Sequence, residues 1–256
     1  MKQLLVFVLF SFFVASIVAP DKLTFSTYSN KSNLYSNYNI DVVDLIKIDI
    51  PEISKLDKFQ NLDTKISKTV FNLAFNAYEN LRAHNKLSEK PIITLVDFTK
   101  PSTEKRLWVI DVEAEKILFK DYCAHGKNTG HNLAKKFSNI NSSYQSSLGF
   151  YKTGEIYYGK HGKSLRLDGL EKGFNCQARN RAIVMHGADY VSEDFIKKQG
   201  RLGRSFGCPS VTTELTEPII DAIADETLLF LYYPDSTYLK ESPILSQLNM
   251  LSANNI

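Results

Sequence analysis

Cysteine is scarce in this chain: its 256 residues include only three, Cys123, Cys176 and Cys208. So few cysteines cannot form a disulfide scaffold, and their odd number leaves at least one thiol unpaired within a monomer. An excess of charge is also lacking, since 31 Lys and Arg residues face 28 Asp and Glu residues and give a net charge of +3. Binding to nucleic acid needs a concentrated basic surface, so we expect no nucleic-acid partner.

Long apolar runs are confined to the N-terminus. Residues 4–14 are apolar apart from Ser11, follow a single lysine and precede small residues up to Ala19. This layout is typical of a secretory signal peptide, which we assign to residues 1–19, with cleavage after Ser16 or Ala19. An uncleaved membrane anchor is the alternative, because the run approaches the length of a spanning helix. Either outcome places the rest of the chain outside the cytoplasm, and we expect no other membrane contact.

Composition divides the remainder into a linker, one domain and a tail. Residues 20–60 are rich in Ser, Asn and Tyr without sustained apolar periodicity, which predicts a linker of low order. Residues 62–81 carry apolar side chains at steps of three and four, which predicts an amphipathic helix packed against the domain. We assign residues 61–235 to the domain, including this leading helix, and expect residues 236–256 to form a peripheral tail.

Strand-rich patterns dominate the domain and predict a fold that is mainly β with peripheral helices, of the α+β class. Predicted strands occupy residues 91–100, 105–112, 113–126, 182–187 and 228–233. The Gly- and Asn-rich residues 126–174 are typical of long loops and hairpins at a sheet edge. Ser192 and Gly200 are placed to cap a short helix, and a second helix is expected from about Thr216, with Pro218 in its first turn.

The most informative residues for chemistry are His186 and Cys208. His186 lies at the end of the apolar segment AIVMHG, and Cys208 follows 22 positions later in the segment SFGCPSV. A cysteine nucleophile needs a neighbouring base that generates the thiolate, together with backbone N–H groups that hold an oxyanion. Gly207 allows close approach of the chain to a substrate, and Pro209 stiffens the turn. The spacing by itself supports a catalytic cysteine and a small buried thiol equally.

The sequence around these two residues favours the catalytic interpretation. The segments RAIVMHGADYV and SEDFIKKQGRLGRSFGCPSV resemble the catalytic domain of extracytoplasmic L,D-transpeptidases of the YkuD-like group, in its murein L,D-transpeptidase branch. The segments KPSTEKRLWVIDV, CAHGKNTGHNLAKKFSN and LLFLYYP extend the resemblance over residues 62–233. It implies an L,D-transpeptidase-like β-sandwich with the cysteine and histidine at one mouth, in an enzyme of the periplasm or another extracytoplasmic compartment.

The resemblance implies a reaction that passes through a thioester. The thiolate attacks the carbonyl of the diamino acid, the third residue of a peptidoglycan stem tetrapeptide, and the terminal D-alanine leaves. An amine of a neighbouring stem resolves the thioester and forms a 3→3 cross-link. Water in place of this amine would give an L,D-carboxypeptidase, and a secreted peptidoglycan-binding protein without turnover is a further alternative. The resemblance implies no cofactor.

Five positions of this chain match catalytic positions of the family motif. The resemblance makes Cys208 the nucleophile, His186 the general base and the backbone carbonyl of Gly187 the group that orients the imidazole. It gives the backbone N–H groups of Gly207 and Cys208 to the oxyanion, and Ser205 matches the hydroxyl position of the motif.

Three further positions are assigned to substrate binding. Phe206 stands where the familiar motif has histidine, and Ser210 where it has asparagine or arginine, which leaves the preferred acceptor open. Arg204 is the nearest cation for a substrate carboxylate. Arg166 and Arg181 are weaker candidates, and we expect both to be solvated surface charges.

Two other classes of site are weighed against cysteine catalysis. Four side chains carry suitable atoms for zinc: Cys123, His125, His131 and His161. Their spacing matches no compact ligand pair, so we predict no metal. A sortase-like site requires an arginine shortly after the cysteine, and none follows Arg204. Cys123 and Cys176 form either a structural disulfide or two separate thiols, and the sequence leaves both possibilities open.

Overall fold

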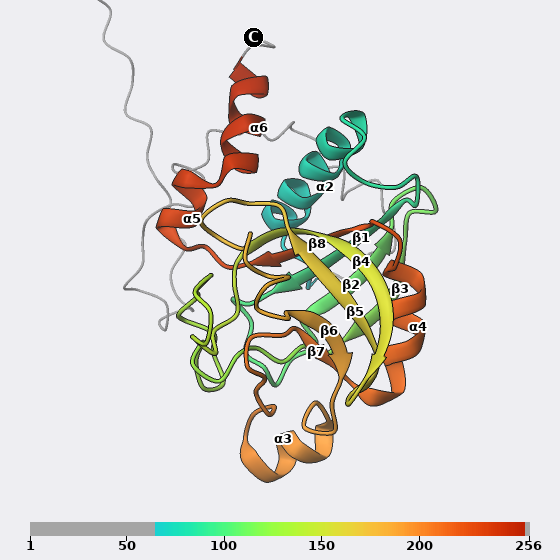
Figure 1. Cartoon of the computed structure of the whole chain (residues 1–256), viewed down its shortest axis with the longest axis vertical. Coiled ribbons are helices and arrows are strands. Elements are labelled where there is room, and N and C mark those ends of the chain that lie inside the picture. The colour runs from blue at the N-terminus through green and yellow to red at the C-terminus, as the bar shows by residue number, and fades with distance from the viewer. Residues whose placement is uncertain (1–64, 254–256) are drawn as a thin grey trace, which may run out of the picture. The chain divides into compact units, whose positions relative to one another are not determined.

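The fold is that of a computed structural model, which describes residues 65–253 (Figure 1). The predicted signal peptide at residues 1–19 and linker at residues 20–60 lie outside these residues. Within residues 65–253, no helix has the length and apolar character needed to cross a membrane.

Eight strands form a mixed sheet in the order β3-β2-β1-β8-β4-β5-β6-β7. They are β1 (Ile92–Asp97), β2 (Leu107–Asp111), β3 (Lys116–Asp121), β4 (Gly149–Gly159), β5 (Gly162–Gly169), β6 (Val184–Gly187), β7 (Ser210–Val211) and β8 (Leu228–Tyr232). Neighbouring strands are antiparallel except for the parallel pairs β1–β8 and β6–β7. Strands β1 and β8 are buried along their whole length, which explains their continuous apolar sequences. The prediction of a mainly β fold with peripheral helices is confirmed.

The two ends of the sheet approach each other just beyond β3. The backbone N–H of Ala124 donates a hydrogen bond of 2.8 Å to the carbonyl of Ser210 in β7. Gly126 forms a bridge with Ser205 in the same region. The sheet therefore curls over itself, and the segment after β3 lies beside the segment that holds Cys208.

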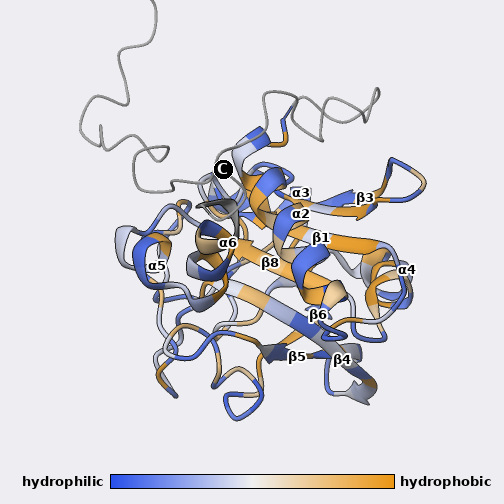
Figure 2. Ribbon diagram, turned by 90° about the horizontal axis from the view of Figure 1, so that it is seen from above, coloured by the Kyte–Doolittle hydropathy of each residue, from blue (hydrophilic) through white to orange (hydrophobic). Residues whose placement is uncertain are grey.

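Helix α2 (Lys68–Ala83) lies across strands β1 and β8, as Figure 2 shows. Its buried face includes Phe71 and Tyr78. The apolar spacing predicted this helix correctly, although it begins at Lys68 rather than near residue 62. It begins there because the side chain of Ser67 caps it and accepts a hydrogen bond from the N–H of Val70.

Helices α3 and α4 follow strands β6 and β7. The short helix α3 (Glu193–Gln199) has both of its predicted caps. Helix α4 (Thr213–Ile223) begins three residues before the predicted start, so Pro218 lies in its second turn rather than its first. Thr212 occupies the N-cap position but its side chain makes no capping hydrogen bond. Its N–H and hydroxyl both donate to the carboxylate of Asp121 at the end of β3, which fixes the start of the helix.

The C-terminal segment belongs to the core and is not the peripheral tail that composition predicted. It forms two helices, α5 (Ser236–Glu241) and α6 (Pro243–Ala253). Tyr238 and Leu245 are completely buried. The buried carboxylate of Glu171 accepts hydrogen bonds from the hydroxyl of Tyr238, at 3.0 Å, and from that of Ser242. A buried carboxylate needs such donors. Tyr238 and Leu245 also belong to the same hydrophobic core as the strand residues, so this segment is part of the domain core.

The hairpin of β4 and β5 lies between β8 and β6 in the sheet and not at the predicted edge. Its first half is largely buried, whereas its far half and the turn at residues 160–161 are exposed. The polar composition belongs to this projecting half. The prediction of a position at the sheet edge was wrong. The polar residues are exposed because the hairpin projects beyond its neighbours, and not because one of its strands is unpaired.

Candidate active site

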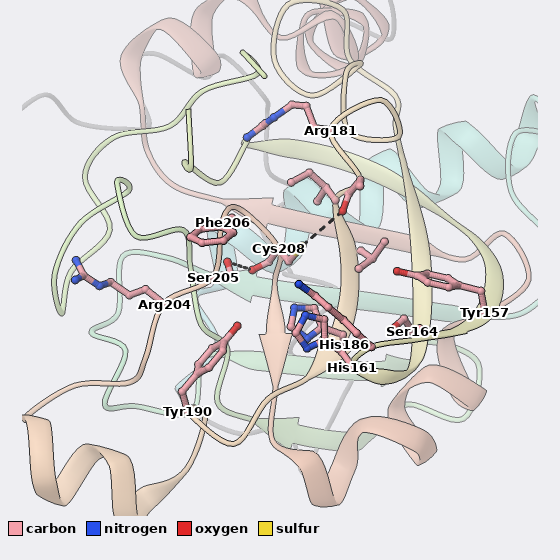
Figure 3. A pocket seen from close by; sticks show the side chains of 15 residues that line it. Tyr157, His161, Ser164, Arg181, His186, Tyr190, Arg204, Ser205, Phe206 and Cys208 are labelled. Carbon is pink, nitrogen blue, oxygen red and sulfur yellow. Dashed lines mark hydrogen bonds between the residues drawn. The ribbon is translucent and has the colours of Figure 1, made fainter. Parts of the chain in front are cut away.

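A cavity of about 600 Å³ lies beside strand β6. Its walls come from the β4–β5 hairpin, from β6 and the residues before it, and from the loop that leads into β7 (Figure 3). His186 and Cys208, the pair identified from the sequence, both line this cavity, and so do Arg204 and Phe206. The sheet topology thus gathers residues from three parts of the chain into one concave site.

His186 is held by a hydrogen bond on each ring nitrogen. Its Nδ1 lies 2.8 Å from the carbonyl oxygen of Gly187, and its Nε2 lies 3.0 Å from the hydroxyl of Ser210. A carbonyl can only accept, so Nδ1 carries the hydrogen and Nε2 carries the lone pair of the neutral ring. Burial lowers the pKa of His186, partly offset by the Gly187 carbonyl. The imidazole is therefore neutral at pH 7 and able to accept a proton at Nε2.

The position of Ser210 does not fit the expected contact with substrate. Ser210 is completely buried in β7, and its hydroxyl lies against His186 and, at 3.1 Å, against the hydroxyl of Tyr190. Its side chain therefore acts on the imidazole. Tyr190 gave no sequence signal beyond its position four residues after His186, and the contact depends on the pairing of β6 with β7.

The thiol of Cys208 is free and half-buried. Burial raises its pKa, while the backbone N–H of Val184 and the positive charge of Arg181 lower it. Its Sγ lies 3.8 Å from the carbonyl of Ala182, at the limit of a weak hydrogen bond (Figure 3). Within residues 65–253, no hydrogen bond joins Sγ to His186.

The turn before Cys208 is fixed by Ser205. The hydroxyl of Ser205 donates to the carbonyl of Cys208, at 2.7 Å, and accepts from the N–H of Gly207, at 3.0 Å. Gly207 has φ of 133°, and a Cβ there would lie 2.9 Å from the carbonyl oxygen of Gln145. Glycine is thus required for the backbone. Because its N–H is engaged by Ser205, however, Gly207 does not have the free oxyanion donor that the motif implied.

Arg181 braces a loop at the rim of the cavity rather than pointing into solvent as expected. Its guanidinium donates to the carbonyls of Ser138 and Gln145, at 2.7 and 2.6 Å, and to the hydroxyls of Ser143 and Ser147. These bonds occupy both terminal nitrogens, whereas the buried Nε has no hydrogen-bond partner within residues 65–253. Arg181 therefore contributes its charge to Cys208 and its hydrogen bonds to the loop.

Arg166 fits the expectation of a surface charge. Its Nε lies 3.1 Å from the carboxylate of Glu155, and its guanidinium packs over the ring of Tyr157. Neither contact directs Arg166 toward Cys208, so it is not a candidate for substrate binding.

Arg204 and Phe206 form one side of the cavity mouth. Arg204 donates through Nη1 to the carbonyls of Lys127 and Gly130, and it forms no ion pair with an acidic side chain in residues 65–253. Phe206 is 64% exposed, and its ring centroid lies 4.7 Å from that of Tyr144. The ammonium of Lys127 lies 4.5 Å from the ring centroid of Tyr144 and 5.0 Å from that of Phe206. The mouth thus carries two cations and two exposed aromatic rings.

A family model described as the L,D-transpeptidase catalytic domain matches residues 62–232. This chain belongs to that family. The matched residues of the L,D-transpeptidase domain include helix α2, all eight strands of the sheet and the segment from His186 to Cys208. The family inferred from the sequence motifs is therefore confirmed, over nearly the same residues.

Three solved structures are similar to the L,D-transpeptidase domain. The helical cell shape determining protein Pgp2 of Campylobacter jejuni has 16% identity and a TM-score of 0.38, over 66% of this chain and 55% of its own. Bd1075 of Bdellovibrio bacteriovorus has 17% identity and a TM-score of 0.36, over 66% of this chain and 59% of its own. An L,D-transpeptidase of Xylanimonas cellulosilytica has 13% identity and a TM-score of 0.32, over 75% of this chain and 92% of its own. The chain thus spans less than two thirds of the first two proteins. No curated protein sequence is significantly similar.

The residues weighed as zinc ligands have other surroundings in the L,D-transpeptidase domain. Within residues 65–253, no three His, Cys, Asp or Glu side chains are grouped to hold a metal ion. Burial lowers the pKa of His125 to about 3, and the neutral ring accepts a hydrogen bond at Nδ1 from Arg106, at 2.8 Å. Cys123 is buried, Cys176 is exposed and both are free, so they do not form a disulfide here.

Arg106 supports the turn before Cys208 in the L,D-transpeptidase domain. It is completely buried, and its guanidinium donates to the carbonyls of Lys100 and Cys123 and to the ring of His125. The carbonyl of His125 in turn accepts from the N–H of Ser205, at 3.0 Å. One buried cation, just before β2, is thus connected through His125 to the turn that carries the thiol.

Arg106→Leu is expected to lower the free energy of unfolding by about 3–5 kcal/mol, because several buried acceptors lose their donor and leucine fills the space incompletely. Urea denaturation followed by circular dichroism measures this. Arg166→Leu is the matched control and is expected to cost less than about 1 kcal/mol, since its ion pair is exposed. Equal losses in the two variants would contradict a structural role for Arg106.

Proposed function

We propose that this L,D-transpeptidase domain uses Cys208 to form 3→3 cross-links between peptidoglycan stems. The observation that carries the proposal is that a thiol and a neutral histidine with its lone pair on Nε2 line one cavity. Membership of the family supports a peptidoglycan stem peptide as the substrate. No cofactor takes part in the proposed reaction.

The first step moves the Sγ proton of Cys208 to Nε2 of His186, and the hydroxyl of Ser210, which donates to Nε2 at rest, turns its hydrogen away from the ring as this happens. The N–H of Val184 and the charge of Arg181 favour the thiolate because they lower its pKa against the effect of burial. The sulfur then attacks the carbonyl carbon of the diamino acid. For the resulting oxyanion, we propose the backbone N–H of Cys208 as a donor, because that of Gly207 is already bonded to Ser205.

The second step breaks the amide bond to D-alanine. The leaving nitrogen takes the proton from Nε2 of His186, and the acyl group remains on Sγ as a thioester. The amine of a second stem then attacks the thioester carbonyl and gives its proton to His186. The sulfur leaves as thiolate, and the new amide bond is the 3→3 cross-link.

Water as the acceptor is a second candidate, which would make the enzyme an L,D-carboxypeptidase. The observation that favours it is the exposed Phe206 at the mouth, because its ring cannot donate a hydrogen bond to an acceptor stem. The same thioester serves both reactions, so the outcome depends on how well the mouth holds the second stem.

The proposal is tested by incubating the protein with purified stem tetrapeptides and analysing the products by mass spectrometry. We expect a dimer that has lost one D-alanine. Formation of tripeptide and free D-alanine without a dimer would show that the enzyme is a carboxypeptidase and not a transpeptidase. Unchanged tetrapeptide would overturn both and favour a peptidoglycan-binding protein without turnover.

Arg204 is the side chain that we propose to bind a substrate carboxylate, since it lines the cavity without an acidic partner in residues 65–253. Arg204→Gln is expected to raise KM for the tetrapeptide about tenfold with little change in kcat, because a charge-assisted hydrogen bond is lost. Steady-state kinetics measure this. Arg201→Gln is the control, because Arg201 is close in the sequence but is not among the residues that line the cavity. Its side chain instead donates to the carbonyl of Leu202 and to the ring of His131. Equal KM values in the two variants would exclude Arg204.

The proposed reaction requires an extracytoplasmic location, where peptidoglycan stems are found. The predicted signal peptide at residues 1–19 supports export to the periplasm or an equivalent compartment.

A further inference from the structure

Two hydroxyl groups form a chain that ends on the histidine of the site. The hydroxyl of Tyr190 lies 3.1 Å from that of Ser210, which lies 3.0 Å from Nε2 of His186. Strand pairing sets this contact, because His186 and Ser210 are partners in the parallel ladder of β6 and β7. Ser210 is completely buried, whereas Tyr190 lines the cavity. This chain of hydrogen bonds therefore runs from the cavity wall to Nε2 of the imidazole.

The direction of each hydrogen bond in the chain follows from the carbonyl of Gly187. That carbonyl accepts a hydrogen bond from the N–H at Nδ1, so Nε2 of the neutral ring carries no hydrogen and can only accept a hydrogen bond. The hydroxyl of Ser210 must then donate to Nε2, and its oxygen is left to accept from the hydroxyl of Tyr190. At rest, the hydrogen bonds point from Tyr190 through Ser210 to His186.

Protonation of His186 reverses this direction. Nε2 becomes a donor in the imidazolium, so the oxygen of Ser210 must accept, and the Ser210 hydrogen turns toward the oxygen of Tyr190. Only a group that both donates and accepts can serve the two states of a ring buried to this degree. A hydroxyl meets this condition by rotating about one bond.

We propose that Ser210 and Tyr190 are positioning residues that hold the neutral tautomer of His186 and stabilise its imidazolium, and so set the pH at which Cys208 reacts. The inference rests on the proposed roles of His186 and Cys208, which it deepens. It gives Ser210 and Tyr190 an action on the histidine rather than on the peptide.

Other charged and titratable groups also face His186. The ring of His161, from the turn between β4 and β5, stacks on it with centroids 4.3 Å apart (Figure 3). Electrostatic interactions with His161 and Lys160 lower the pKa of His186 further, after the larger effect of burial. Cys208 shares the cavity with them. Any pH profile of the site therefore includes these groups, and the test must isolate the hydroxyl chain from them.

The test measures the rate at which iodoacetamide alkylates Cys208 in the full-length protein between about pH 6 and pH 10. Ser210→Ala removes the acceptor of the imidazolium, whose hydrogen bond is stronger than that of the neutral ring, so proton transfer from the thiol becomes less favourable. We expect alkylation about tenfold slower at pH 7, with the difference from the wild-type rate shrinking as the pH rises and the thiol ionises without the base. Tyr190→Phe should slow it about threefold in the same pattern.

Two variants serve as controls for the hydroxyl chain. Ser210→Thr keeps a hydroxyl and should restore the wild-type profile. Ser164→Ala removes a buried hydroxyl from the partner of His186 in β5, where it bonds to Gly162 and not to the ring. It should leave the profile unchanged.

An unchanged profile in Ser210→Ala, or a loss of rate that is equal at every pH, would overturn the inference. The readout does not depend on turnover of stem peptides. If the profile shifts but tetrapeptides are not processed, the hydroxyl chain stands while the proposed function fails.

Discussion

Cys208→Ala is expected to abolish release of D-alanine from a stem tetrapeptide, lowering the rate by at least about 10³-fold. No thioester can form without the sulfur, and no other described cysteine lines the cavity. Because Cys208 is only half-buried, the free energy of unfolding should change by less than about 1 kcal/mol. Chromatographic assay of D-alanine and urea denaturation measure the two effects.

The control is Cys176→Ala, which removes an exposed thiol outside the cavity. Its activity should equal that of the wild type. Retained activity in Cys208→Ala, in protein that denatures normally, would remove cysteine from the proposed mechanism. Loss of activity in both variants would point to an effect of thiols unrelated to the cavity.

His186→Ala is expected to lower the rate of D-alanine release by about 10²–10⁴-fold and to change the pH dependence of the thiol. Without the base, Cys208 must ionise alone, and burial raises its pKa above the ordinary value. Since the thiolate is the reactive form, alkylation should be slow at pH 7 and rise about tenfold per pH unit up to that raised pKa. Rates of alkylation against pH measure this directly.

The control for His186 is His161→Ala, which removes the stacked ring but leaves both hydrogen bonds of His186 in place. We expect a change of less than about threefold in alkylation at pH 7. An identical pH profile in His186→Ala and the wild type would exclude His186 as the base.

Local sequence patterns were sufficient to predict most of the fold. The apolar steps between residues 62 and 81 predicted α2, and continuous apolar runs predicted the buried strands β1 and β8. The caps of α3 were also readable, because capping depends on neighbouring residues. The tail was misjudged, since the burial of Tyr238 depends on its contact with Glu171, 67 positions earlier in the chain.

The site was predictable where the motif is local and not where it depends on distant pairing. The motif identified His186, Gly187 and Cys208, and the cavity contains the imidazole and the thiol. The contact of Ser210 with His186 arises from the register of β6 against β7, which no spacing in the sequence reveals. Likewise, Arg181 looked like a surface charge because the serine-rich loop that it braces lies about 40 positions earlier.

The most direct test of the proposed mechanism is mass spectrometry of the intact protein after mixing with a stem tetrapeptide. We predict an adduct equal in mass to the tetrapeptide without D-alanine, located by digestion on the peptide that contains Cys208 and absent from Cys208→Ala. An adduct on another residue, or tetrapeptide consumed by the Cys208→Ala variant, would contradict the proposed role of Cys208.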